Sequence, residues 1–283
     1  MLLLASITFI AAVVNGALGY GFSSITVPLA LLFLENRVLN PALVLIEVAL
    51  NAYVLWVNRR AAAAVWRRVT TIIIGLVPGI IVGTIIIARV NPGWLRFATF
   101  VVLLPLILIQ AAGYRRPIRA EHAFGFLFGT AVGMLYSVTT ISGPPLAVML
   151  SNQGLVLHEF RAALGLIRLA ESSLTGVSYQ TAGLLTTDSL RLAVAIVPSV
   201  LIGVPIGAWV IRHVRAETFR RVCMSFDAWV VAFGLATLLR QLHVVESRAA
   251  FIIVGIVGAL DAWLLYRFFS NGGDGDTGST RTT

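Results

Sequence analysis

Long apolar runs constrain this chain more than any other feature of its sequence. A helix crosses the hydrocarbon core of a bilayer with about 20 apolar residues. The composition, 58% hydrophobic and only 12% charged residues, excludes an ordinary soluble domain and predicts an all-α integral membrane protein. A polar tail, residues 270–283, has little to bury and is expected to be disordered. The apolar runs cover residues 2–34, 39–57, 69–88, 95–112, 123–150, 161–180, 189–211, 221–239 and 249–269.

The first and fifth runs are interrupted near their middle. Residues 15–28 are NGALGYGFSSITVP, and residues 133–145 are GMLYSVTTISGPP. Glycine and proline disrupt helical backbone, and neighbouring hydroxyl groups bond to peptide groups that a break sets free. We therefore expect each run to form two half-helices, the second beginning near Ser24 in one case and near Gly143 in the other. Each broken run is then either a steeply tilted span or a re-entrant hairpin that enters and leaves on one side.

Arginine placement favours the hairpins. All 21 basic residues are arginines, and Arg168 alone lies in the middle of a run. If every run spans the membrane, ten of the other twenty arginines lie on each side of it. If the two broken runs are hairpins, fourteen lie on one side and six on the other. Cytoplasmic loops carry the excess of positive charge, so this topology places the N-terminus outside and the C-terminus in the cytoplasm. The six residues on the outer side are Arg37, Arg89, Arg96, Arg191, Arg240 and Arg248.

The two halves of the chain also correspond in sequence. The pattern Pro78-x4-Gly83 matches Pro198-x4-Gly203, and Glu47-x3-Asn51 matches Glu171-x3-Thr175. The order hairpin, helix, helix, helix occurs twice, so the second unit is inverted relative to the first, as in many secondary transporters. The predicted units are residues 1–112 and 123–239, followed by an extra transmembrane helix at 249–269. Asp261 in that helix is expected to contact the rest of the bundle.

Helix breaks at membrane depth predict an anion-binding site. The N-terminus of a half-helix presents unpaired N–H groups and a partial positive charge, and two such ends can hold an oxyanion between them. The alternative interpretation is that the small residues only allow close helix packing. The predicted substrate-binding residues are Gly19, Gly21, Ser23, Ser24, Thr26, Asn51, Thr139, Thr140, Ser142, Gly143 and Arg168.

Two carboxylates lie at equivalent positions inside the runs. An ionisable group within a span is costly, so Glu47 and Glu171 are candidates for carrying a coupling proton. Arg168 precedes Glu171 by three residues, which allows a structural ion pair on one helix face. Alternatively, Arg168 faces the substrate anion, and Glu171 releases Arg168 when the anion binds. Glu47 has no arginine nearby in sequence, which makes it the stronger proton-carrier candidate.

Three segments resemble a known family. GALGYGFSSITVPLAL, SGPPLAVML and PSVLIGVPIGAWVIRHV are similar to the TauE/SafE sulfite-exporter family, over roughly residues 10 to 240. The resemblance implies a membrane transporter that exports sulfite, an organosulfonate or another small anion.

The sequence favours a secondary transporter working by alternating access over two other classes. A passive anion channel lined by the same hydroxyl groups is the alternative. An enzyme is not expected, because H-E-x-x-H, G-x-S-x-G and the P-loop pattern are absent. The expected partners are a small anion, the lipid bilayer and a coupling proton or sodium ion, with no nucleic acid, cofactor or metal. The sequence leaves open whether the protein forms a homodimer.

Overall fold

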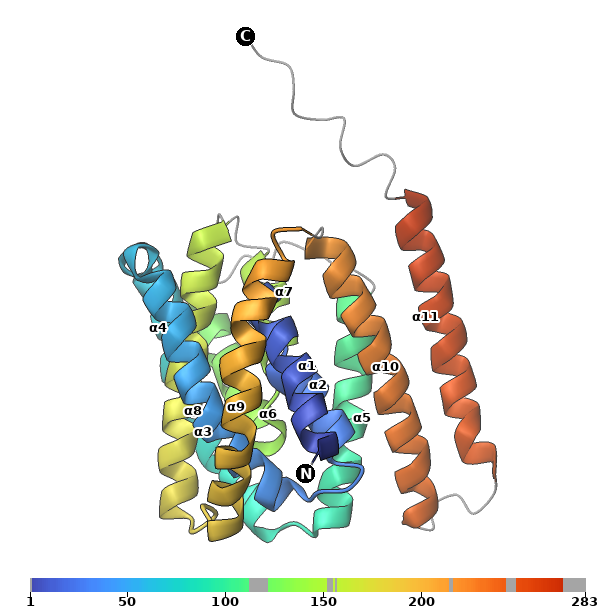
Figure 1. Ribbon diagram of the computed structural model, residues 1–283. Helices are drawn as coiled ribbons and strands as arrows, with labels where there is room; N and C mark the ends of the chain where they lie inside the picture. Colours follow the sequence, from blue (N-terminus) through green and yellow to red (C-terminus); the bar gives the residue numbers. More distant parts are fainter. Residues whose placement is uncertain are drawn as a thin grey trace.

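The fold is a bundle of helices, with no strand among the residues that the structure describes (Figure 1). The structure is a computed structural model, and it describes residues 2–111, 122–151, 155, 157–213, 216–242 and 248–271. Its helices are α1 (Leu2–Leu18), α2 (Phe22–Ala30), α3 (Asn36–Val57), α4 (Arg59–Arg89), α5 (Pro92–Ala111), α6 (His122–Thr139), α7 (Gly143–Ser151), α8 (Leu157–Thr181), α9 (Thr187–Val210), α10 (Ala216–Gln241) and α11 (Ile252–Asn271), with a short 3-10 turn at Arg248–Phe251.

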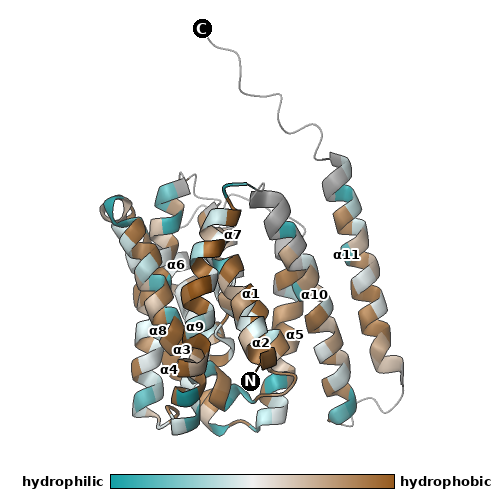
Figure 2. Cartoon of the chain, viewed as in Figure 1, coloured by the Kyte–Doolittle hydropathy of each residue, from teal (hydrophilic) through white to brown (hydrophobic). Residues whose placement is uncertain are grey.

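Length and composition confirm an all-α membrane protein. Four described segments are long and apolar enough to cross a bilayer: Asn36–Val57, Arg59–Arg89, Thr187–Val210 and Ala249–Arg267. Shorter apolar helices accompany them, among them Leu2–Leu18 and Gly125–Thr139. Figure 2 shows hydrophobic residues along the middle of the helices and hydrophilic residues mainly near their ends.

Both interrupted runs break where the sequence predicts. The first run divides into α1 and α2 at residues 19–21, where Gly19 and Gly21 have φ of 81° and 104°. These left-handed values favour glycine because a side chain would be strained there. The fifth run divides into α6 and α7 at residues 140–142, and Thr140 takes the left-handed conformation with φ of 56°. The second half-helices begin at Phe22 and Gly143, within two residues of the predicted starts.

One helix starts much earlier than its apolar run. The fourth helix begins at Arg59, ten residues before the run at 69–88, and only Asn58 separates it from α3. The added turns are RRAAAAVWRR, in which residues 61–64 are alanines, the strongest helix formers, and no glycine or proline intervenes. The apolar run marks the part of α4 that can lie in hydrocarbon, whereas helix propensity sets where α4 begins.

Helix contacts connect the first half of the chain with the second. The closest helix pairs are α4 with α6 and α1 with α9, while α3 lies against α8. Helices at matching positions in the two halves have matching partners. In one half α3 packs on α9, and in the other α8 packs on α4; likewise α2 packs on α10, and α7 packs on α5. The division into two inverted units at 1–112 and 123–239 stays a prediction.

Glycines allow the two closest helix pairs to form. A Cβ on Gly75 or Gly79 of α4 would overlap backbone atoms of Phe126 or Thr130 in α6. A Cβ on Gly207 of α9 would overlap the carbonyl oxygen of Val13 in α1. Small residues let helix backbones approach in this way where lipid supplies no hydrophobic driving force between helices.

The last helix, α11, lies at the edge of the molecule beside α10 (Figure 1). Asp261 joins them: its carboxylate accepts hydrogen bonds from Ser225 at 3.0 Å and from the Trp229 indole at 3.3 Å, and forms an ion pair with Arg221 at 3.6 Å. The expected contact of Asp261 with the bundle is confirmed. Residues 270 and 271 of the predicted tail belong to α11; residues 272–283 lie outside the described residues, as do Arg115, Arg116, Arg119, Arg215 and Arg281.

Gly79→Ala is expected to lower the melting temperature of the protein in detergent. Its Cβ would overlap the Thr130 carbonyl oxygen, so α4 and α6 must separate. Such overpacking costs about 1–3 kcal/mol. The control is Gly255→Ala in α11, where a Cβ has no described neighbour within 4 Å and alanine favours the helix. Equal melting temperatures for Gly79→Ala and the unchanged protein would contradict the close packing.

Candidate functional site

The two breaks come together inside the protein. Tyr20, between the two left-handed glycines of the first break, is only 7% exposed. A Cβ on Gly143, the first residue of α7, would lie 3.2 Å from Cδ2 of the Tyr20 ring. The start of α7 therefore contacts the break that precedes α2, as expected if both breaks contribute to one site.

Glu47 of α3 is the most densely bonded polar group near the breaks. Its side chain is fully buried. Oε1 accepts a hydrogen bond from Ser23 Oγ at 2.7 Å and another from Arg168 Nη2 at 2.7 Å. Oε2 accepts one from Tyr136 Oη at 2.6 Å. These donors belong to α2, α8 and α6, so a single carboxylate connects both halves of the chain.

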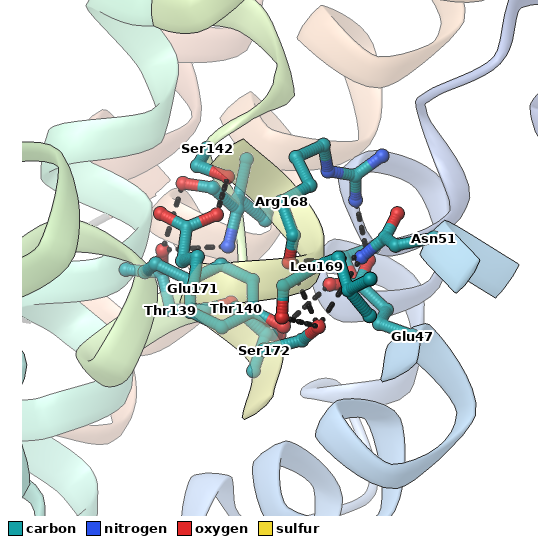
Figure 3. Close-up of polar contacts among 12 residues, drawn as sticks. Glu47, Asn51, Thr139, Thr140, Ser142, Arg168, Leu169, Glu171 and Ser172 are labelled. Atoms are coloured by element: carbon teal, nitrogen blue, oxygen red, sulfur yellow. Dashed lines mark hydrogen bonds and ion pairs between the residues drawn. The ribbon is translucent and has the colours of Figure 1, made fainter. Parts of the chain in front are cut away.

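Glu171 of α8 is equally buried but has fewer partners. Its Oε2 accepts a hydrogen bond from Ser142 Oγ at 2.5 Å, and Oε1 has none. Ser142 directly precedes α7, just as Ser23 lies at the start of α2. Each carboxylate is thus bonded to a hydroxyl group beside the second half-helix of its own half of the chain. Figure 3 shows the contact of Glu171 with Ser142.

Arg168 is a buried cation with free donors. The residue is 2% exposed, and its ion pair with Glu47 uses Nη2 at 2.7 Å. Within the part of the chain that the structure describes, its Nε and Nη1 groups have no hydrogen-bond partner. Of the two alternatives for Arg168, the local ion pair with Glu171 is wrong for this structure, since Arg168 bonds to Glu47, 121 positions away in the sequence. The packing of α3 against α8 brings Glu47 to it.

Asn51 fixes α3 to the backbone of α8. Its Nδ2 group donates to the Arg168 carbonyl oxygen at 3.2 Å and to Ser172 Oγ at 3.4 Å. Because Asn51 lies one turn after Glu47, this contact holds α3 and α8 together beside the ion pair. The structure therefore gives Asn51 a positioning contact next to the predicted site.

The hydroxyl groups of the second break mostly satisfy the break itself. Thr139 Oγ1 donates to the Leu135 carbonyl oxygen at 2.8 Å and accepts from the Ile141 N–H at 3.1 Å, and Thr140 Oγ1 donates to the Thr139 carbonyl oxygen. In the first break, Ser24 is buried, and the buried Thr26 hydroxyl has no partner. Of the predicted hydroxyls, Ser23 and Ser142 are the two that contact the carboxylates.

Proline limits what the start of α7 can donate. Its first residues are Gly143, Pro144 and Pro145, and proline has no N–H. The backbone at this end therefore has fewer N–H donors than an ordinary helix start, and the Ser142 hydroxyl beside it donates to Glu171. The start of α2, Phe22-Ser23-Ser24, contains no proline. Its N-cap residue is Gly21, which has no side chain to cap the first N–H groups. The two breaks are similar in position but not in their donor groups.

Sequence reasoning missed Tyr136 and Tyr20. Tyr136 lies one turn before Thr140. A polar aromatic residue this close to a predicted break is the sequence feature that could have identified Tyr136 as a site residue. Its partner Glu47 is 89 positions away, and no local spacing identifies such a pair. Among the described residues, no three His, Cys, Asp or Glu side chains lie close enough to hold a metal ion.

These features define a multi-pass membrane protein with a buried, charged polar site at two meeting helix breaks. The family described as Sulfite exporter TauE/SafE matches residues 4–235, and the chain belongs to that family. It is therefore a membrane transport protein of an anion-exporting family, and the resemblance noted in the sequence is confirmed. Comparisons with curated proteins and with solved structures gave no match. Helix α11 lies beyond the matched residues.

Tyr136→Phe is expected to destabilise the protein by about 1.5–3 kcal/mol, the usual contribution of a hydrogen bond to a charged group. The ring remains and only the hydroxyl donor to Glu47 is lost. The measurement is thermal unfolding in detergent. Tyr266→Phe is the matched control, because that residue is 75% exposed on α11. An equal, small change in both variants would show that the Tyr136 hydroxyl does not stabilise Glu47.

Proposed function

We propose that the protein is a secondary transporter that exports a small anion by alternating access, with the anion bound between the two helix breaks. The observation that carries this proposal is Arg168, a buried cation whose Nε and Nη1 groups have no hydrogen-bond partner among the described residues. Buried donors are costly when unpaired, and a ligand with several oxygen atoms would satisfy them. Ser23 and Ser142, one from each break, lie within the same group of side chains.

The proposed substrates are sulfite, an organosulfonate or a small carboxylate. All present two or three oxygen atoms on one centre, which suits the planar fork of a guanidinium group. The proposed contacts come from Arg168, Ser23 and Ser142, with Gly19, Gly21 and Gly143 shaping the breaks. Family membership supports an anion, and the direction of transport is proposed on the same basis.

A proton is the proposed coupling ion, with sodium as the alternative. Glu47 and Glu171 are the proposed carriers, because both are fully buried carboxylates beside the proposed anion site. The proposed orientation places the N-terminus outside the cell and the C-terminus in the cytoplasm, following the arginine bias. We propose transport and not catalysis, because the site contacts are those of an ion-binding centre.

Replacing Arg168 with glutamine is expected to weaken sulfite binding about 10- to 100-fold, which corresponds to losing about 1.5–3 kcal/mol of charged hydrogen bonding. Isothermal titration of the purified protein measures it. Arg191→Gln is the matched control, since the Arg191 side chain is 78% exposed on α9. The double change Arg168→Gln with Glu47→Gln guards against misfolding, because no buried charge is left unpaired. Undiminished sulfite binding in both Arg168 variants would refute the proposed site.

Counterflow distinguishes the carrier from a passive channel. Proteoliposomes loaded with unlabelled sulfite are expected to accumulate labelled sulfite transiently above its external concentration. An alternating-access carrier exchanges one anion for another, whereas a channel only lets both equilibrate. Sulfite flux without such an overshoot, and without saturation, would favour the channel.

A further inference from the structure

The carboxylate of Glu47 is bonded as a bound oxyanion would be. It accepts from a cation, Arg168, and from two hydroxyl groups, Ser23 and Tyr136, at 2.6–2.7 Å. These donors come from α8, α2 and α6, and all three residues are at most 2% exposed. A buried receptor of this kind, with one positive charge and hydroxyl donors, is what a small oxyanion needs in order to leave water.

We propose that Glu47 is an internal substitute for the transported anion, and that the anion takes its place on Arg168 only when Glu47 takes up a proton. This inference rests on the proposed function and adds to it which of the two carboxylates carries the proton, how the proton is linked to the anion, and in what ratio. One proton from the solvent forms an O–H bond on the Glu47 carboxylate for each singly charged anion bound. The proton leaves a hydronium ion or a buffer acid of the solvent, no other covalent bond forms or breaks, and the net charge of the site is unchanged.

Charge balance is the physical reason for the exchange. Arg168 and ionised Glu47 form a neutral buried pair. A second anion added to that pair would leave an uncompensated negative charge in a buried setting, which is far more costly than a neutral pair. Protonated Glu47 releases the guanidinium group, so that the incoming anion becomes its counter-ion.

Glu171 is less suited to this exchange although it is the equivalent residue. Its hydrogen bond comes from Ser142, and it does not share the ion pair of Arg168. A proton on Glu171 would alter the contact with Ser142 and leave Arg168 held by Glu47. Glu171 therefore influences the site electrostatically, while Glu47 controls access to the cation.

The groups that face Glu47 are few. Tyr136 of α6 and Arg168 of α8 bond to it, and Glu171 of α8 is close enough to interact electrostatically. Helix α2 has no titratable side chain, and it contributes Ser23. Among the described residues, the charged side chains of α4, α5 and α9 make no hydrogen bond or ion pair with Glu47. The pH dependence of the exchange is thus a property of this one cluster.

Release of Glu47 would also loosen contacts between helices. Its carboxylate is the common acceptor for α2, α6 and α8, so protonation weakens three contacts at once. A ligand shifts a conformational equilibrium only through contacts that differ between the states. The exchange makes the contacts of the two states different. Glu47 belongs to α3 and ties that helix to Arg168, whereas a bound anion is free of the chain and leaves α3 untied.

The test measures proton uptake on anion binding. The purified protein is titrated in weak buffer with methanesulfonate, a strong-acid anion that stays ionised, and in parallel with sulfite. The expected result is about one proton taken up per anion bound. Because Glu47 is ionised before binding in this scheme, the apparent Kd for methanesulfonate is expected to rise about tenfold for each unit by which the pH is raised. Glu47→Gln is expected to bind at every pH with no proton uptake, and it supplies the baseline for the proton exchange of sulfite itself.

The outcomes separate this inference from the proposed function. Binding without proton uptake, or equal uptake in Glu47→Gln, would overturn the exchange and leave the anion site standing. No binding of either anion would overturn the proposed function and the exchange with it. If Glu47→Gln does not fold, the infrared difference spectrum of the unchanged protein decides. A carbonyl band of a newly protonated carboxyl group must appear on methanesulfonate binding, and its absence would refute the exchange.

Discussion

The buried ion pair between Arg168 and Glu47 is the interaction on which the rest of this structure depends. Moving two charges out of water is costly, and their attraction offsets the cost only with good geometry and further hydrogen bonds. Ser23 and Tyr136 supply those bonds. Both come from segments next to a break, so the ion pair is stable only when the two broken runs meet. Fold and site therefore depend on each other in this chain.

Glycine packing is what brings the breaks to the ion pair. The close approach of α4 to α6 positions Tyr136, and that of α1 to α9 positions the segment that leads to Ser23. The small residues in the two broken segments allowed two alternative interpretations from sequence, close packing and anion binding. In the structure, Gly16 and Gly133 allow helix contact, since a Cβ there would overlap the backbone of α9 or α4. Gly19 and Gly21 instead form the first break itself.

Sequence alone predicted what depends on local pattern. Apolar length identified the membrane helices, and clustered glycine, proline and hydroxyl residues located both breaks to within about two residues. It failed where partners are distant in sequence. Arg168 and Glu171 are three positions apart, and that spacing allowed a local ion pair as one of two alternatives, yet the actual partner of Arg168 is 121 positions away. Helix periodicity describes neighbours on one helix, whereas a contact between α3 and α8 depends on how the whole bundle packs.

The corresponding halves are chemically unequal, and this matters for any transport cycle. The position three residues before Glu171 is Arg168, whereas the position three residues before Glu47 is the buried Val44. Among the described residues, Arg168 pairs with only one of the two corresponding carboxylates, and that one, Glu47, belongs to the other half of the chain. If both halves carried an arginine, each could neutralise its own glutamate, and no charge would be left to respond to a substrate. In the proposed exchange, Glu47 and an incoming anion compete for the one positive charge of Arg168, and such competition would couple anion binding to proton uptake.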